Sequence, residues 1–366
     1  MNMKTRFFKA GLLAAAVFGI VACNNSEMET GKTQSKDIFN TAGVGNVSFG
    51  VAESVSFTKS QIASDNNKIK HIQLFVFDKS GALIASKGKN FSTTTSATSS
   101  LASDTVQITV PLGVAGMRVF ALANSESESE QWSSVKDTAT LKKCISKLSS
   151  NSADCMSAIG DRDGLTFSRD SVYTVSVKRF GVKVILENIT TAFVSSVHQG
   201  LDFKLEEIFL TNVQSECPYS QVPIDTNAAG WINKRGFVSS DVNDLVAETG
   251  LATDLKAGSD VRHYFYCYPN RTVKAADSHD TQGDFTVRRT RLVLKTSLGS
   301  ETYYYPIDLP GSDTGKLESN KRYTITDLKI TGIGVNDPET VLEKGSISCR
   351  ITIQDWETGE IWSVEY

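Results

Sequence analysis

The chain has 366 residues, of which 40% are hydrophobic, and this suits one large or two medium globular domains. Its 38 basic and 41 acidic residues nearly cancel, giving a formal net charge of -3. Binding to a phosphate backbone needs a concentrated positive surface, so this balance gives no electrostatic basis for a nucleic-acid partner.

Residues 1–22 have the pattern of an export signal. Lys4, Arg6 and Lys9 precede the apolar run "AGLLAAAVFGIVAC", which is too short to span a bilayer as a helix. The run ends in Ile-Val-Ala-Cys, which resembles a bacterial lipobox. We therefore expect cleavage before Cys23 and attachment of diacylglycerol to its thiol. An ordinary secretory signal that contains a cysteine is the alternative.

The first predicted strand lies just beyond a polar tether, residues 24–44. Within residues 45–57 the apolar side chains alternate with small or polar ones, as in a half-buried strand, and only Glu53 interrupts the apolar face. That face consists of Val47, Phe49, Val51, Val55 and Phe57. Burying five such side chains contributes on the order of 10 kcal/mol, which is comparable with the stability of a whole domain.

More strands follow in the first half of the chain. Two runs within residues 68–87 flank Asp78-Lys79-Ser80-Gly81, a typical hairpin turn. Strands are also predicted at 104–112 and 116–125, and one or two short helices between 125 and 160. Alternation then runs almost unbroken from Val172 to Ile185. We expect one long strand there, crossing between two domains that meet near residue 180.

The second half is predicted to be rich in strands as well. Strand-like runs occupy residues 201–213, 261–268, 285–298, 302–309, 322–331 and 345–356. In the last of these, Ile347, Cys349, Ile351 and Ile353 share one face. Many short strands separated by turns indicate an all-β fold of two tandem β-sandwiches with minor helices.

No pattern in the sequence indicates an enzyme or a cofactor. The four histidines do not form an HExxH pair, and no G-x-S-x-G elbow occurs. The carboxylates of "GDRDG" and of "DSHDTQGD" could bind a cation, or could be solvated turns; they are Asp161, Asp163, Asp277, Asp280 and Asp284, with His279 beside them. The aromatic run "HYFYCYPN" reads as a core strand or as a surface that stacks on sugars.

Five cysteines remain besides Cys23, and an odd number cannot all pair within the chain. Cys144 and Cys155 are close enough in sequence to bridge a small loop, and whether they do is left open. Cys267 and Cys349 lie in apolar strand-like runs, so we expect them to be buried free thiols.

The closing segment, residues 319–356, reads "SNKRYTITDLKITGIGVNDPETVLEKGSISCRITIQDW". It resembles the end of the Bacteroidales fimbrillins, the shaft subunits of type V pili, in its N-K-x-Y start, its T-G-x-G turn with N-D-P soon after, its E-K-G-S lead-in and its final Asp-Trp. The lipobox, "VFDKSG", "RVFALANS", "KRFGVKVIL" and "YYYP" agree with that family more weakly.

The resemblance implies a maturation pathway. Fimbrillins are exported as lipoproteins to the outer membrane, a trypsin-like protease at the cell surface cuts after an arginine or lysine, and the first strand is removed. For this chain we expect the cut after Lys59, with Lys68 and Lys70 as alternatives. The expected division is a signal peptide at 1–22, a tether with the removable strand at 23–59, and domains at 60–180 and 181–366.

The resemblance also implies polymerisation, because the emptied groove would accept a strand from the C-terminal segment of another subunit. Ile347, Cys349, Ile351 and Ile353 have the period to replace Val47, Phe49, Val51 and Val55. The expected partners are other copies of the subunit and the anchor and tip proteins of the fimbria. The final run "EIWSVEY" favours a donating shaft subunit. The alternative is a permanently lipidated anchor, or a surface glycan-binding lipoprotein, that keeps its first strand.

Overall fold

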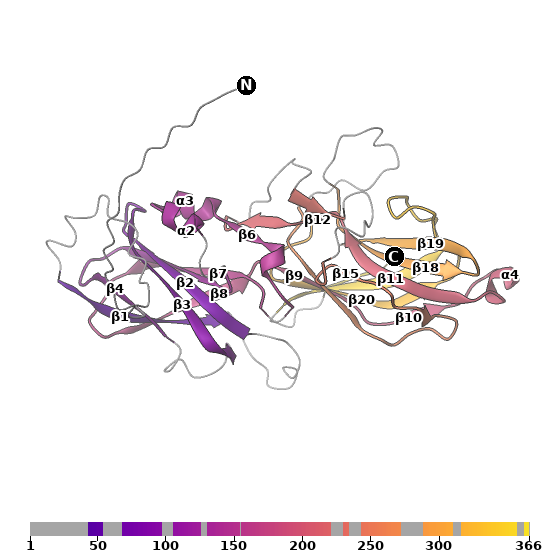
Figure 1. Cartoon of the computed structure of the whole chain (residues 1–366), viewed down its shortest axis with the longest axis horizontal. Coiled ribbons are helices and arrows are strands. Elements are labelled where there is room, and N and C mark those ends of the chain that lie inside the picture. The colour runs from indigo at the N-terminus through magenta and orange to yellow at the C-terminus, as the bar shows by residue number, and fades with distance from the viewer. Residues whose placement is uncertain are drawn as a thin grey trace, which may run out of the picture.

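The structure is a computed structural model that describes most of the chain from Gly43 onward. The described residues are 43–53, 68–96, 105–125, 130–153, 155–220, 230–233, 243–271, 288–309, 316–356 and 362–365. Strands dominate them, with a few short helices, and form two β-sandwiches that follow one another along the long axis of the molecule (Figure 1). The predicted all-β fold with minor helices is confirmed.

The first sandwich is built from one sheet with the strand order β3-β2-β5-β7-β8-β1-β4. Its strands are β1 (Val44–Glu53), β2 (Lys68–Phe77), β3 (Leu83–Ser96), β4 (Val106–Pro111), β5 (Met117–Ala123), β7 (Ala158–Leu165) and β8 (Val172–Arg179). β7 and β8 pair through two residue pairs, Ala158 with Arg179 and Ile159 with Lys178. Buried side chains of β2 and β5 share one core with those of β1, β4 and β8, so the sheet folds over at this point into two layers.

A close backbone approach accompanies the fold between β7 and β8. A Cβ atom on Gly160 would lie 1.8 Å from the carbonyl oxygen of Ser176, so any larger residue would push β7 away from β8. β7 itself was not predicted, because its middle residues are exposed and charged and show no apolar alternation.

The strand β2 is buried on both faces. Leu74 and Val76 point into the sandwich core, whereas Phe75 and Phe77 belong to a second cluster on the other face. This explains why the run is almost continuously apolar. The predicted hairpin turn between β2 and β3 is confirmed, since Asp78 Oδ1 accepts hydrogen bonds from the N–H groups of Ser80 (2.8 Å) and Ala82 (3.0 Å).

The second face of β2 is covered by the short helical segment predicted between residues 125 and 160. It contains α2 (Gln131–Ser134), α3 (Thr138–Lys143), β6 (Ile145–Lys147) and η1 (Leu148–Ser150). The ring of Trp132 lies 5.6 Å from that of Phe75 and 5.8 Å from that of Tyr219. The segment therefore packs between the first sandwich and the second half of the chain, and β6 pairs with β13 (Glu216–Pro218).

The second sandwich consists of two facing sheets. One has the order β17-β9-β20-β21-β22, with β10 beside β20, and the other has the order β15-β11-β18-β19, with β16 beside β11. The bounds are β9 (Val182–Leu186), β10 (Ile189–Thr191), β11 (Phe203–Thr211), β15 (Ala247–Glu248), β16 (Thr253–Asp254), β17 (His263–Cys267), β18 (Arg291–Leu298), β19 (Glu301–Asp308), β20 (Lys321–Ile330), β21 (Ile347–Asp355) and β22 (Trp362–Glu365). β12 (Val213–Gln214) pairs with β14 (Trp231–Ile232), and α4 (Ser196–Gln199) lies at the far end (Figure 1).

The long strand predicted from Val172 to Ile185 is wrong in one respect, because it is broken. β8 ends at Arg179 in the first sandwich, and β9 begins at Val182 in the second. At the break, a Cβ atom on Gly181 would lie 2.5 Å from Met156 Cε. Chain segments far apart in sequence meet here, and the glycine leaves room for them.

Candidate functional site

The predicted first strand lies in the interior of a sheet. β1 is antiparallel to β4, with Val44 opposite Pro111 and Phe49 opposite Val106, and it is parallel to β8, with Ser48 opposite Val172. β4 is the edge strand, and β1 is its ladder partner. Removal of β1 would therefore expose backbone donors and acceptors on both β4 and β8.

The apolar face of β1 fills the core of the first sandwich. Val47 is 1% exposed and Phe49 is fully buried, with its ring 5.8 Å from that of Phe167 and 5.6 Å from that of Tyr173. Val51 continues the register opposite Val175. The predicted residues Val55, Phe57, Lys59 and Cys23 lie outside the described residues.

Polar contacts hold the start of β1 in place. The N–H of Ser48 donates to the carbonyl of Ser171 (3.0 Å), and the carbonyl of Asn46 accepts from the N–H of Asp170 (3.1 Å). The hydroxyl of Thr109 donates to Asn46 Oδ1 (2.8 Å). These bonds fix the register in which Val47 and Phe49 point inward.

The walls of this position are the groove that sequence reasoning could not assign. They are the buried side chains of β4 and β8 that share a core with β1: Val106, Ile108, Val110, Val175 and Val177. β4 shows the alternation of a half-buried strand, so its inward residues could have been found by period alone. That these residues lie close to β8, more than 60 residues further along the chain, could be learned only from the folded structure.

The predicted donor strand is part of the second sandwich. β21 lies between β20 and β22, with Tyr323 opposite Ile353 and Ile325 opposite Ile351. Ile351 is fully buried and Cys349 is 9% exposed, whereas Ile347 and Ile353 are partly buried against the same core. The four residues share one face as predicted, but that face points into their own domain, and β1 and β21 belong to different sheets.

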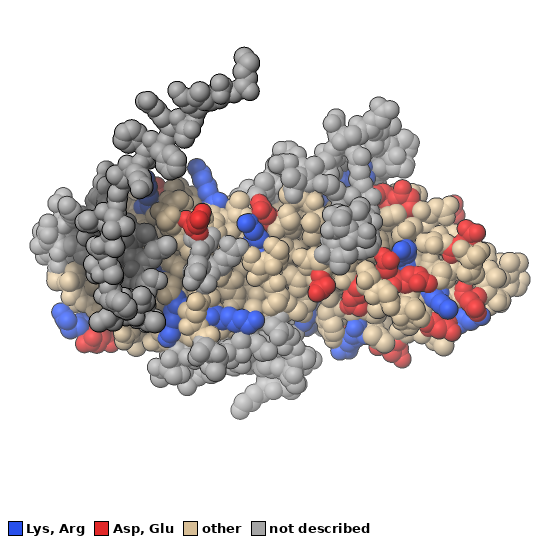
Figure 2. Space-filling model, in the orientation of Figure 1, with Lys and Arg blue, Asp and Glu red and all other residues tan. Residues whose placement is uncertain are grey.

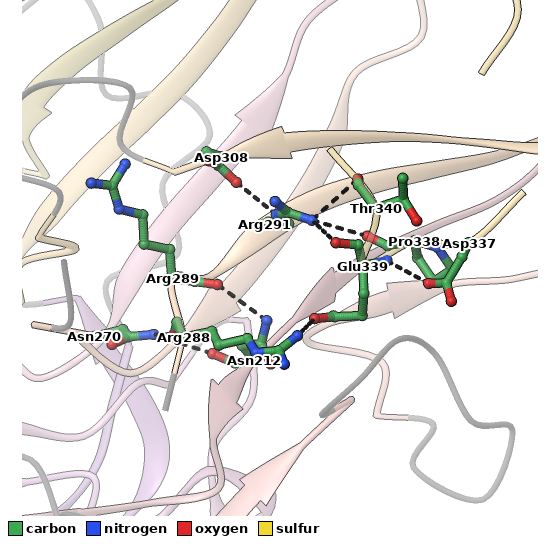
Figure 3. A network of polar contacts seen from close by, with 10 residues as sticks. All are labelled: Asn212, Asn270, Arg288, Arg289, Arg291, Asp308, Asp337, Pro338, Glu339 and Thr340. Carbon is green, nitrogen blue, oxygen red and sulfur yellow. Dashed lines mark hydrogen bonds and ion pairs between the residues drawn. The ribbon is translucent and has the colours of Figure 1, made fainter. Parts of the chain in front are cut away.

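The connection from β20 to β21 is held by a network of buried charges that sequence reasoning missed (Figure 3). Arg288 Nη1 donates to Glu339 Oε2 (2.6 Å), and both side chains are buried. Arg291 Nε donates to Asp308 Oδ1 (2.6 Å), and its Nη1 donates to the carbonyl of Glu339 (2.9 Å). The N-D-P-E-T stretch that carries part of the family resemblance is thus fastened to the start of β18.

The other candidate sites have a structural explanation or lie outside the described residues. Arg118 Nε donates to Asp161 Oδ2 (2.8 Å), so a guanidinium already neutralises part of the "GDRDG" cluster. In "HYFYCYPN", Tyr266 and Tyr268 are buried while Tyr264 is 41% exposed, so the reading as a core strand is confirmed. Asp277, His279, Asp280 and Asp284 fall outside the described residues.

The cysteines are buried thiols. Cys144, Cys155, Cys217, Cys267 and Cys349 are all free, so Cys144 and Cys155 do not bridge the loop between them. Burial disfavours the thiolate, and it raises the pKa of Cys349 and of Cys144 to about 11. Such thiols react slowly unless the surrounding structure opens.

The surface of the described residues carries both signs of charge. Lys and Arg side chains are mixed with Asp and Glu side chains over the visible face (Figure 2). No helix among the described residues is long and apolar enough to cross a membrane.

Residues 45–182 match the family model described as the major fimbrial subunit protein (FimA). The resemblance to fimbrillins is confirmed. A solved fimbrilin (FimA) from Porphyromonas gingivalis is similar over 86% of this chain and 98% of its own, with a TM-score of 0.57 and 14% identity. The tip fimbrial protein Mfa3 from the same species is similar over 86% of this chain and 100% of its own, with a TM-score of 0.51 and 13% identity.

At these identities, the solved structures establish the fimbrillin fold. No curated protein sequence matches the chain. The FimA match spans β1, β4 and β8, the strands that build the groove. It supports a structural or adhesive role in a pilus at the cell surface, in association with other fimbrial components. Neither the family description nor the two names refers to an enzyme.

Proposed function

We propose that this protein is a fimbrial subunit that is exported as a lipoprotein, loses β1 by proteolysis and polymerises when β21 of another copy enters the emptied groove. The observation that carries the proposal is the place of β1 in its sheet. An interior strand, paired on both sides, lies at the N-terminal end of the domain, where a single cut can release it.

The energy of the emptied groove provides the driving force. Val47 and Phe49 are buried, and each such side chain contributes about 1.5 to 3 kcal/mol. Loss of β1 also removes the backbone partners of β4 and β8. Strand addition replaces both contributions, because main-chain hydrogen bonds pair the edges and alternate side chains fill the pockets.

The places of Lys68 and Lys70 in β2 support Lys59 as the proposed cleavage site. Lys68 and Lys70 lie within β2, where Lys68 pairs with Ser96 and the N–H of Lys70 donates to Asn124 Oδ1 (2.8 Å). A protease must bind its substrate in an open, extended form, so cleavage there would require part of β2 to leave its sheet. Lys59 precedes β2 by nine positions and avoids that cost.

The donor strand is matched in length and period to the strand that it would replace. β21 has nine residues and β1 has ten. Because β21 is buried in its own domain, donation exchanges one burial for another. The free-energy difference between β21 in its own domain and β21 in the groove of another copy therefore depends on the groove walls and on contacts between subunits. Because β21 must first separate from β20, the exchange is slow.

A reversible lock tests the donation of β21. Thr324 of β20 lies opposite Thr352 of β21, and antiparallel partners have Cα atoms about 4.5 to 5.5 Å apart, which a disulfide can span. The variant Thr324→Cys/Thr352→Cys, cleaved by limited trypsin, should not polymerise when oxidised and should polymerise after reduction. Polymerisation of the fully oxidised variant at the wild-type rate would exclude β21 as the donor.

The disulfide tests the donation of β21 more selectively than a charged substitution on the apolar face of β21 would. Ile351 is fully buried in its own domain, so Ile351→Asp would unfold the monomer as well as prevent donation. A disulfide leaves the folded monomer in place and stops only the movement. The reduced form of the same protein is the matched control.

A further inference from the structure

The segment between β20 and β21 divides into a firmly held part and a weakly held part. Near its start, the Tyr305 hydroxyl donates to the carbonyl of Gly332 (3.0 Å). Val335 then forms a two-way backbone bridge with Tyr304, through N–H to carbonyl bonds of 2.7 and 2.9 Å. This bridge covers the outer edge of β19, which is the edge strand of its sheet.

The held part ends with the charged network. Arg291 is almost completely buried, and its guanidinium donates to Asp308 Oδ1, to the carbonyl of Pro338 (3.3 Å) and to the carbonyl of Glu339. Removing the segment would leave this guanidinium and that of Arg288 with fewer acceptors inside the protein. Uncompensated buried charge is among the most costly changes in a folded protein.

Residues 341–346, by contrast, are held weakly. Val341 is 62% exposed, and Gly345 has a φ of +88° with open space where a Cβ would be. Their backbone bonds stay within the segment between β20 and β21: the N–H of Ser346 donates to the carbonyl of Glu343 (3.2 Å), and the carbonyl of Ser346 accepts from the N–H groups of Thr331 (2.9 Å) and Gly332 (3.1 Å). The Thr331 hydroxyl donates to the carbonyl of Gly345. Leu342 packs partly against the core.

From this contrast we infer that the Arg288–Arg291 network, named here the clamp, fixes the segment as far as Thr340, and that the donor strand pivots within residues 341–346. This inference rests on the proposed function. The clamp sets the reach of the donor, because the seven residue-to-residue steps from Thr340 to Ile347 span at most about 25 Å. It also keeps the edge of β19 covered after β21 has left.

A second lock, matched to the first, tests the pivot. Tyr304 and Val335 are antiparallel partners bonded in both directions, so Tyr304→Cys/Val335→Cys places a disulfide before the pivot. The oxidised variant should polymerise within twofold of the rate of its reduced form. A tenfold or greater loss on oxidation, restored by reduction, would show that the held part must detach and would overturn the inference.

The two locks separate the possible failures. If the Thr324–Thr352 lock blocks polymerisation and the Tyr304–Val335 lock also blocks it, β21 is the donor but the pivot is placed wrongly. If neither lock has an effect, β21 is not the donor, and the inference about the pivot is wrong as well. Blocking by the first lock alone is the expected result.

Hydrogen exchange gives an independent readout that needs no substitution, in case the loss of the Tyr304 ring unfolds the variant. The amide of Thr340 donates to the carbonyl of Asp337 (3.1 Å), and that of Glu339 donates to Asp337 Oδ1 (2.7 Å). Both should exchange equally slowly in the cleaved monomer and in the polymer. If these two amides lost their protection from exchange on polymerisation, that result would contradict a fixed clamp.

Discussion

The burial of Phe49 is the interaction that most directly keeps β1 in the first sandwich. Phe49 is fully buried against Phe167 and Tyr173, so Phe49→Ala should lower the free energy of unfolding of the uncleaved precursor by about 3 to 5 kcal/mol. Urea denaturation measures this loss. Val44→Ala, at a side chain in the same strand that is 43% exposed, is the matched control and should change the free energy by less than about 0.5 kcal/mol.

Equal effects from the two substitutions would mean that the apolar face of β1 does not support the first sandwich. The groove would then have little energy to gain from a donated strand. The comparison therefore tests the physical basis of the proposal before any polymer is made.

Individual residues also show where sequence reasoning stops. Val47 and Phe49 could be predicted as buried because alternation is a local signal. The ion pair between Arg288 and Glu339 joins residues 51 positions apart, and no local sequence pattern predicts it. The same holds for Arg118 and Asp161, whose contact turns a candidate cation ligand into half of an ion pair.

At the scale of elements, the strands with clean alternation were predicted well. β4 and β21 lie where their patterns placed them, and β1 does so as far as Glu53, whereas Val55 and Phe57 of its predicted apolar face are outside the described residues. β7 was missed because its exposed middle, with Asp161 and Asp163, has the composition of a turn. The break between β8 and β9 was missed although the apolar positions change phase there, from Val175 and Val177 to Phe180 and Val182. The close packing of Met156 that accompanies the break is not local.

The movement of β21 can be followed through its own thiol. Cys349 is buried and its pKa is raised to about 11, so a maleimide should modify it only when β21 leaves its sheet. In cleaved protein that is polymerising, Cys349 should be modified much faster than Cys267, a fully buried thiol of β17 that stays in place. Mass spectrometry of peptides measures both rates.

The oxidised Thr324→Cys/Thr352→Cys variant is the control for this labelling. It should protect Cys349 and leave the slow rate of Cys267 unchanged. If Cys349 and Cys267 react at one common rate in every sample, the whole second sandwich opens together and β21 does not move as a separate element.

At the scale of the molecule, the two sandwiches have different parts in the proposed assembly. The first contains the groove, with β1 between β4 and β8, and the second contains the strand that would fill the groove of another copy. Helices α2 and α3 and the pair of β6 with β13 join the halves, so both ends of the reaction are carried on one packed unit. The sequence indicated this division of roles only through its resemblance to fimbrillins, because a groove appears only after a strand is taken away.

The measurement that tests this account most directly is the N-terminal sequence and intact mass of subunits recovered from assembled fimbriae. We expect a chain that begins at Ser60, with β1 and the lipidated Cys23 absent. A chain that starts at lipidated Cys23 within the polymer would contradict the account, since β1 would then still fill the groove and the protein would be a permanent anchor or a surface-binding lipoprotein.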